Sequence, residues 1–177
     1  MIMTTNVICI QTYCSPCGDL LLGSMGDKLC LCDWMNRRNR KAVDNRLHRL
    51  LKALYRRQIS DIHVEAIRQL NEYFRHERTS FDVPLLLAGT EFQQEVWQAL
   101  MEIPYGETRS YAEVATQLGN ADVVRAVARA NGANAISIFV PCHRVIGSNH
   151  SLIGYAGGVE AKKYLLDLEQ SLKPFLR

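Results

Sequence analysis

The sequence Pro141-Cys142-His143-Arg144-Val145 follows directly on the apolar run Ala135-Ile136-Ser137-Ile138-Phe139-Val140. The apolar run predicts a buried strand or a buried extended segment, since short continuous apolar stretches are typical of a protein core. A thiol at its end lies beside an imidazole and a guanidinium, and nearby positive charge favours the nucleophilic thiolate. An inert, buried cysteine beside a core histidine is the alternative for this pair of residues taken alone.

Further motifs surround this stretch and together resemble the O6-alkylguanine-DNA alkyltransferase family, also called methylated-DNA–protein-cysteine methyltransferases. The resemblance covers about half of the chain, from Gly89 to roughly the C-terminus, and the N-terminal half matches only loosely. Its motifs are Gly89-Thr90-Glu91-Phe92-Gln93, Val96-Trp97, Ile103-Pro104-Tyr105-Gly106-Glu107-Thr108, Ser110-Tyr111, Arg125-Ala126-Val127, Pro141 to Gly147, Gly154-Tyr155-Ala156-Gly157-Gly158, Lys162, Leu165-Leu166 and Glu169.

The resemblance implies a role for each residue of a nucleophilic site. Cys142 is the expected alkyl acceptor, His143 the general base acting through a bridging water, and Glu169 the carboxylate that orients the histidine. A solvent-exposed helix glutamate is the alternative for Glu169. Asn134 matches a hinge asparagine, although the family usually has proline where Ala135 stands. Tyr111 matches a tyrosine whose hydroxyl rotates the flanking phosphate and supplies a proton to guanine.

The resemblance also implies the DNA-binding and substrate-pocket residues. The small residues around Arg125, including Val124 and Ala126, permit close approach to the minor groove, and Arg125 takes the place of an extruded base. Together with Tyr111 these residues form the expected DNA contact. The pocket for the flipped base is expected from Val145, Tyr155, Ala156 and Gly157, with plain core packing as the alternative for Tyr155.

The implied reaction repairs double-stranded DNA that contains O6-alkylguanine, and O4-methylthymine is a further expected substrate. Attack of a thiolate on an sp3 carbon gives a thioether that water does not readily hydrolyse, so Cys142 is expected to react once. The resemblance implies no cofactor, and no metal is expected at the site. Three alternatives are a non-catalytic binding module of the same fold, a helix-turn-helix transcription regulator and a thiol hydrolase.

The predicted fold is α+β. We expect a ribonuclease H-like domain with an antiparallel sheet over residues 1–88 and a mostly helical, winged-helix-like domain with a helix-turn-helix over residues 89–177. In the first domain, residues 7–13, 19–25 and 28–34 predict an antiparallel meander, and the next segments predict helices from Ala42 to Arg57 and from Asp61, the expected N-cap, to His76. An extended segment around Pro84 precedes the second domain.

The second half predicts four helices. Thr90 is the expected N-cap of a helix over 91–102, and Ser110 that of a helix over 111–118. Gly119-Asn120 forms a turn, and a further helix starts at Ala121 or Asp122 and runs to about Asn131. The second and third of these helices form the expected helix-turn-helix, with an ordinary helical corner as the alternative. A last helix carries Glu169.

Charge is distributed unevenly along the 177 residues. Residues 1–89 carry 13 Lys and Arg against 9 Asp and Glu, whereas residues 90–177 carry 8 against 9. A basic cluster between Arg37 and Arg57 is most simply the solvated face of a helix, with nucleic-acid binding as the alternative.

The six cysteines, at positions 9, 14, 17, 30, 32 and 142, are expected to be reduced. Cys14 and Cys17 with Cys30 and Cys32 raise the alternative of a zinc site, but the single-residue gap between the last pair also fits one face of a strand. No apolar stretch is long enough to span a membrane, and Met1 to Asn6 lacks the features of a secretory signal. A cytoplasmic monomer is therefore expected, nucleoid-associated in a bacterium or nuclear in a eukaryote.

Overall fold

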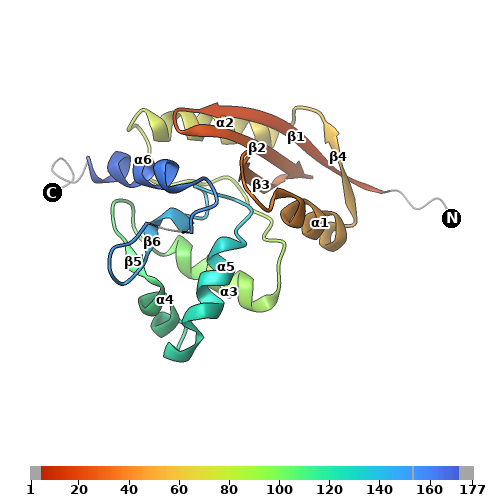
Figure 1. Cartoon of the computed structure of the whole chain (residues 1–177). Coiled ribbons are helices and arrows are strands. Elements are labelled where there is room, and N and C mark those ends of the chain that lie inside the picture. The colour runs from red at the N-terminus through yellow and green to blue at the C-terminus, as the bar shows by residue number, and fades with distance from the viewer. Residues whose placement is uncertain (1–4, 153, 172–177) are drawn as a thin grey trace. The chain divides into compact units, whose positions relative to one another are not determined.

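The computed structural model describes residues 5–152 and 154–171 and divides into two compact units, Met1–Gly89 (unit 1) and Thr90–Arg177 (unit 2). Unit 1 contains a four-stranded sheet, and unit 2 is mostly helical (Figure 1). The predicted α+β fold is confirmed. The first four residues, which belong to the stretch examined for a secretory signal, lie outside the described residues. None of the helices in the described part of the chain is long and apolar enough to cross a bilayer.

Unit 1 begins with three antiparallel strands, β1 (Asn6–Ser15), β2 (Gly18–Met25) and β3 (Lys28–Trp34). Two-residue connections separate the strands, and Gly26 in the second connection has a φ of 61°, which glycine adopts without steric cost. The predicted antiparallel meander is confirmed. β2 and β3 are buried along most of their length, so the meander supplies much of the core of unit 1.

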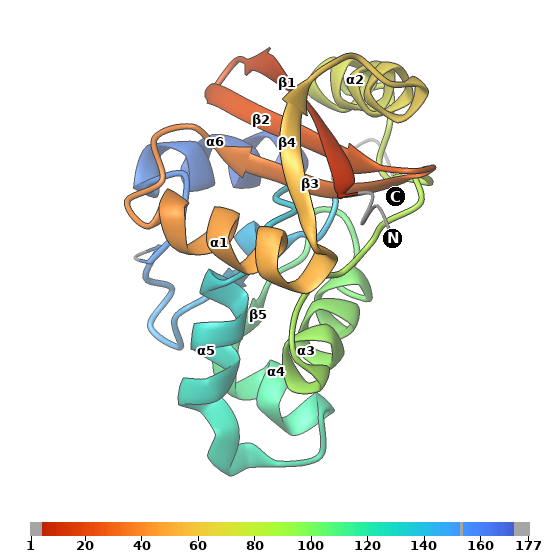
Figure 2. The ribbon, with the colours of Figure 1, turned by 90° about the vertical axis from the view of Figure 1, so that its right-hand side faces the viewer.

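The predicted helix from Ala42 to Arg57 is wrong in its second half. Helix α1 (Arg40–Leu51) ends at Lys52, whose left-handed φ of 49° turns the chain into strand β4 (Ala53–Arg57). β4 pairs in parallel with β1, which gives the sheet order β3-β2-β1-β4 (Figure 2). The apolar Leu54 lies in the part of the chain predicted as helix, yet its side chain is 58% exposed on this edge strand. Tertiary pairing with β1 therefore overrides a short helical periodicity.

Helix α2 (Asp61–Phe74) has Ser60 as its N-cap, and the expected N-cap Asp61 is the first residue of the helix. The Ser60 hydroxyl accepts a hydrogen bond from the His63 amide, and the Ser60 amide donates to His63 Nδ1, so the pair forms a capping box. Leu70 and Tyr73 of this helix face the core. The helix packs against β2 and β3.

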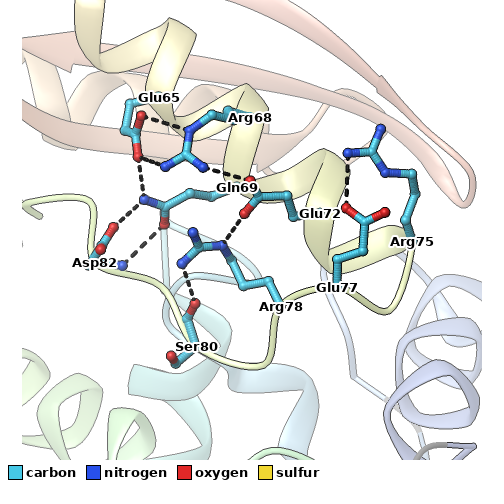
Figure 3. Close-up of polar contacts among 9 residues, drawn as sticks. All are labelled: Glu65, Arg68, Gln69, Glu72, Arg75, Glu77, Arg78, Ser80 and Asp82. Atoms are coloured by element: carbon cyan, nitrogen blue, oxygen red, sulfur yellow. Dashed lines mark hydrogen bonds and ion pairs between the residues drawn. The ribbon is translucent and has the colours of Figure 1, made fainter.

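A polar network joins α2 to the chain that follows it (Figure 3). The fully buried Gln69 side chain donates to Glu65 at 2.7 Å and to Asp82, and it accepts from the Asp82 amide at 3.1 Å. Beyond this network the chain is extended around Pro84, as predicted. The Pro84 carbonyl accepts from the Leu29 amide at 2.8 Å, so the segment lies along β3.

Unit 2 contains the helices α3 (Glu91–Met101), α4 (Tyr111–Gln117), α5 (Val124–Gly132) and α6 (Val159–Gln170). Short elements lie between them: β5 (Arg109–Ser110), the 3-10 turns η1 (Ala121–Val123) and η2 (Cys142–Arg144), and β6 (Val145–Ile146), which pairs in parallel with β5. The expected N-caps Thr90 and Ser110 are confirmed, each within a capping box.

The three helices α3, α4 and α5 pack against one another. The Trp97 indole of α3 donates to the Ala130 carbonyl of α5 at 2.8 Å, which fixes these two helices together. The helix expected to start at Ala121 or Asp122 begins instead as the 3-10 turn η1, and the α-helix starts at Val124. Asn120 caps η1 through its side chain, so a local polar bond delays the α-helix.

Candidate active site

The segment from Ala135 to Val140 is a buried turn. All six residues are buried, but Ile138 has a φ of 73°, and Ser137 forms a bridge with Val140. The prediction of a buried segment is confirmed, whereas the predicted extended conformation is wrong. The turn persists because Asn134 closes it, donating from Nδ2 to the Val140 carbonyl and accepting at Oδ1 from the Ile136 amide, both at 2.9 Å.

Cys142 begins the 3-10 turn η2 directly after this buried turn. Its side chain is buried, and its amide donates to the Val140 carbonyl at 2.8 Å. The Cys142 sulfur interacts electrostatically with Tyr111 from α4 and with Lys162 from α6. Three segments distant in sequence therefore meet around the thiol.

His143 is fully buried beside Glu169, and its Nε2 lies 2.7 Å from Glu169 Oε1. Burial lowers the pKa of His143, although the Glu169 carboxylate opposes this effect, so the ring is neutral near pH 7. A neutral ring that faces a carboxylate through Nε2 carries its proton there, which leaves the lone pair on Nδ1. Nδ1 is buried and has no hydrogen-bond partner among the described residues.

Glu169 is a buried carboxylate shared by several donors. Burial by itself raises the pKa of Glu169, but His143 and Arg144 outweigh burial and hold that pKa far below its usual range. Arg144 donates from Nε to Oε2 at 3.0 Å and from a terminal nitrogen to Oε1 at 2.9 Å. The Gly106 amide donates to Oε2 at 3.4 Å. The alternative of a solvent-exposed Glu169 is excluded.

Arg144 is directed toward Glu169, so its guanidinium pairs with the carboxylate that contacts His143. The guanidinium also donates to the Ile103 carbonyl at 2.7 Å and lies over the Tyr105 ring, 5.8 Å from its centroid. Its charge is therefore used to hold the carboxylate in place. The cause is local: in the 3-10 turn, successive side chains point in different directions.

Lys162 supplies the positive charge near the thiol instead. It is 1% exposed, donates to the Val145 carbonyl at 2.6 Å and lies 5.9 Å from the centroid of the Tyr155 ring. No carboxylate pairs with it in the described ranges 5–152 and 154–171. Burial lowers the pKa of Lys162, and negative charge at Cys142 raises it.

The sequence motifs include Lys162, but we assigned it no role from sequence. One signal was present: Lys162 lies seven residues before Glu169, and two residues that are two helical turns apart share one face of a helix.

Asn131 is a second residue without a prior role. It hydrogen-bonds to Tyr111 through its side chain, which joins α5 to the site. Burial raises the pKa of Tyr111, and the Cys142 charge adds to this increase.

The expected pocket residues lie around Lys162. Val145 and Tyr155 are buried, and each contacts Lys162. Ala156 and Gly157 are half-buried in a turn closed by the Gly158 amide, which donates to the Tyr155 carbonyl at 3.0 Å. Gly158 has a φ of 90° where α6 starts, and this left-handed conformation explains the glycine.

Three of the expected DNA-contact residues lie on α5, and the fourth, Tyr111, is half-buried at the start of α4. Arg125 is exposed, and Val124 and Ala126 are half-buried. The opposite face of the helix, including Val127 and Ala130, is buried against unit 2. The exposed side of the helix therefore presents two cations, Arg125 and Arg129, among small apolar residues, while its opposite face is packed.

The N-terminal cysteines that raised the alternative of a zinc site do not gather. Cys14 is exposed, whereas Cys30 and Cys32 are buried within β3. Within residues 5–152 and 154–171, no group of three or more His, Cys, Asp or Glu side chains could hold a metal ion.

Comparison with known proteins defines the class. Residues 91–171, which carry the site, match the family model described as the 6-O-methylguanine DNA methyltransferase DNA-binding domain. The methylated-DNA–protein-cysteine methyltransferase of Mycobacterium tuberculosis strain H37Rv is 59% identical over 109 residues, which are 62% of this chain and 66% of that protein. The constitutive enzyme of that name in Bacillus subtilis is 44% identical over 88% of this chain and 92% of its own length.

The likeness extends to solved structures. The crystal structure of Mycobacterium tuberculosis OGT in complex with DNA superposes with a TM-score of 0.78 at 44% identity and covers 92% of each chain. The chain described here belongs to the methylated-DNA–protein-cysteine methyltransferase family.

Proposed function

We propose that this protein repairs double-stranded DNA by transferring the alkyl group of O6-alkylguanine to Cys142, with the chemistry confined to residues 89–177. The observation that carries the proposal is the 2.7 Å contact between His143 Nε2 and Glu169. It leaves a basic Nδ1 in the buried site beside a cysteine, and such a nucleophile–base–orienter set serves nucleophilic catalysis. The relatives carry the name of this activity, and one was solved with DNA.

The first step creates the nucleophile. The Cys142 thiol passes its proton to His143 Nδ1, with one water as the bridge, and the Glu169 carboxylate stabilises the imidazolium that forms. The buried Lys162 ammonium balances the thiolate, which it contacts electrostatically. In the activated site the Glu169 carboxylate thus pairs with the His143 imidazolium, and the Lys162 ammonium pairs with the Cys142 thiolate. A fifth charged group, the Arg144 guanidinium, keeps Glu169 in place.

The second step transfers the alkyl group. The thiolate attacks the carbon bound to guanine O6, an S–C bond forms, and the C–O bond breaks with its electron pair leaving on guanine. Guanine then takes a proton from the Tyr111 hydroxyl, which is protonated because burial raises its pKa. The product at Cys142 is a thioether, which no group in the site can hydrolyse, so each molecule reacts once and needs no cofactor.

Access to O6 requires that the nucleotide leave the stacked duplex. We propose that α5 enters the minor groove, that Arg125 fills the space of the extruded base, and that Val124, Ala126 and Tyr111 approach the backbone. Asn134 holds the buried turn at the end of α5. The flipped base enters a pocket of Val145, Tyr155, Ala156 and Gly157. The same pocket would accept O4-methylthymine, whose alkyl group also lies on an exocyclic oxygen of the base.

Intact-protein mass spectrometry tests this proposal. After incubation with a duplex containing O6-methylguanine, the protein should gain one CH2 per chain, and peptide mapping should place it on Cys142. Cys142→Ser keeps the size of the side chain and should stay unmodified. An unmodified wild-type protein that binds the duplex tightly would indicate a binding module, and more than one repaired base per chain would disprove the single reaction.

A further inference from the structure

The segment between Met35 and Gln58 in unit 1 is strongly basic. It contains nine Lys and Arg residues and a single acidic residue, Asp44. This segment forms α1, β4 and the turn before them. Such a density of one sign of charge raises the free energy of the folded protein unless counter-charges or a ligand offset it.

Only part of this charge is neutralised within the protein. Arg37 and Arg40 form ion pairs with the buried Asp33 at 3.0 and 3.2 Å, and Arg40 also pairs with Asp44 at 3.0 Å. Among the described residues, six further cations of the segment are exposed, and their side chains form no ion pair or hydrogen bond. We call them the basic surface; they are Arg38, Lys41, Arg49, Lys52, Arg56 and Arg57.

Three cations of the basic surface follow one another along helix α1. Lys41 and Arg49 lie eight residues apart on the exposed side of α1, so their Cα atoms are about 12 Å apart along the helix axis. Lys52 continues the row at the C-cap. A DNA duplex carries one negative charge per about 1.7 Å of its axis, so this row alone spans several phosphates.

The cations of this segment also act on one another. Burial lowers the pKa of Arg46, and the positive charges of Arg37 and Arg49 lower it further. Asp33 opposes this shift but does not cancel it. A polyanion bound at the basic surface would relieve this repulsion.

Unit 2 lacks the charge that binding to DNA normally requires. Residues 90–177 carry 8 basic against 9 acidic residues, and α5 offers only Arg125 and Arg129. Non-specific DNA affinity comes chiefly from Lys and Arg contacts with phosphate. We propose that the basic surface of unit 1 binds the phosphate backbone of double-stranded DNA and supplies this missing attraction. The inference rests on the proposed function only in taking duplex DNA as the substrate.

An acidic protein is the other polyanion that the basic surface could bind. Leu50 and Leu54, which are 43% and 58% exposed, lie between the cations and would suit a partner with apolar side chains. The phosphate backbone is favoured because cations dominate the surface and because the family acts on DNA. The experiment below separates the two.

The salt dependence of binding to an undamaged duplex tests the proposal in the full-length protein. The variant K41Q/R49Q/K52Q removes three cations of the basic surface. The matched control K28Q/R75Q/K163Q removes three exposed cations elsewhere in the chain. Each phosphate contact contributes about 0.9 to the slope of log K against log salt. We expect the first variant to lose about 2–3 from the slope and the control to keep the wild-type slope.

Two further measurements fix the interpretation. Transfer to Cys142 from free O6-benzylguanine should be the same in all three proteins, since this small substrate needs no phosphate contact. If the wild-type protein did not take the benzyl group from this substrate, that result would count against the proposed function, and the salt measurement would remain valid. Equal salt slopes in all three proteins, or equal losses in both variants, would overturn the inference. Loss of polyglutamate binding with an unchanged DNA slope would overturn it in favour of an acidic protein.

Discussion

Lys162 and Glu169 are opposite charges on one face of α6, and they serve different partners. Glu169 is neutralised by Arg144 and orients His143. Among the described residues, Lys162 hydrogen-bonds to the Val145 carbonyl and lies near the Tyr155 ring, and it acts electrostatically on Cys142. Removal of either charge should therefore slow alkyl transfer, but the two removals should differ in their effect on stability.

Lys162→Met should lower the rate of alkyl transfer while leaving the free energy of unfolding unchanged or slightly higher. The substitution removes the positive charge that balances the thiolate. It also removes the cost of burying that charge, which offsets the loss of the hydrogen bond to the buried Val145 carbonyl. The rate loss should be greatest at low pH, where the thiolate is scarce. Single-turnover kinetics with free O6-benzylguanine over a pH series, together with urea unfolding, measure both effects.

Glu169→Gln is the matched comparison because it removes the other charge with almost no change in shape. It leaves Arg144 as a buried cation without a carboxylate to neutralise it, which costs about 3–5 kcal/mol. This variant should lose both rate and stability. If Lys162→Met were destabilised as strongly as Glu169→Gln, the assignment of Lys162 as counter-charge to the thiolate would be wrong.

At the scale of elements, the buried turn before Cys142 depends on one side chain. Asn134 makes two hydrogen bonds across the turn, while Ile138 occupies a left-handed conformation that is unfavourable for a β-branched residue. The Asn134 bonds therefore hold a backbone that would otherwise relax. Because Cys142 follows the turn directly, its position depends on these bonds.

Asn134→Ala should destabilise unit 2 and slow alkyl transfer together. It leaves the buried Ile136 amide unpaired, at a cost of about 1–3 kcal/mol, and it removes one of the two hydrogen bonds that the Val140 carbonyl accepts. Asn120→Ala is a suitable control, since Asn120 also hydrogen-bonds a backbone amide but is exposed. Urea unfolding should show a much smaller loss for the control. Equal losses would show that burial of the two groups is not decisive.

The same turn shows what the sequence can and cannot predict. Apolar composition predicts burial of residues 135–140, and this is correct, because burial depends on residue type. The conformation is set by the Asn134 side chain, which acts across six residues and has no local periodicity. Capping by Thr90 and Ser110 is predictable for the opposite reason, since the cap and its partner lie three residues apart.

In the site, too, local motifs could be predicted from the sequence, whereas contacts between distant segments could not. The family resemblance brings Cys142, His143 and Glu169 to attention, and the structure brings His143 and Glu169 into contact beside Cys142. The direction of the Arg144 guanidinium could not be predicted, because it depends on which side of the 3-10 turn meets α6. Strand β4 was missed for a related reason: its pairing partner β1 lies about 47 residues earlier in the sequence.

At the scale of the whole molecule, two buried histidines make stability depend on pH. Burial lowers the pKa of His63 in unit 1 and of His143 in unit 2 below the ordinary value of 6.5. Below that value the unfolded chain binds protons that the folded protein excludes, so stability falls as the pH drops through 6.5 toward the folded-state pKa. Glu169, whose pKa is lowered from 4.5, adds a further loss in more acidic solution.

Thermal unfolding between pH 8 and pH 5 should therefore show a falling midpoint below about pH 6.5, the ordinary histidine pKa. His63→Gln and His143→Gln should each flatten the part of the curve that its unit contributes. His150→Gln, at an exposed position, is the control and should leave the curve unchanged in shape. A midpoint that stays constant down to pH 5 would contradict this account.

The parallel pairing of β4 with β1 has a consequence for the order of folding. The hairpins β1–β2 and β2–β3 join neighbouring segments, whereas β4 can pair only after the chain has passed through both hairpins and α1. Contacts between residues far apart in sequence form late, because a long loop must first be closed. We therefore expect the edge strand to close last and to open first. The basic surface is assembled from α1 and this strand, so bound DNA should slow unfolding of the protein without accelerating its folding.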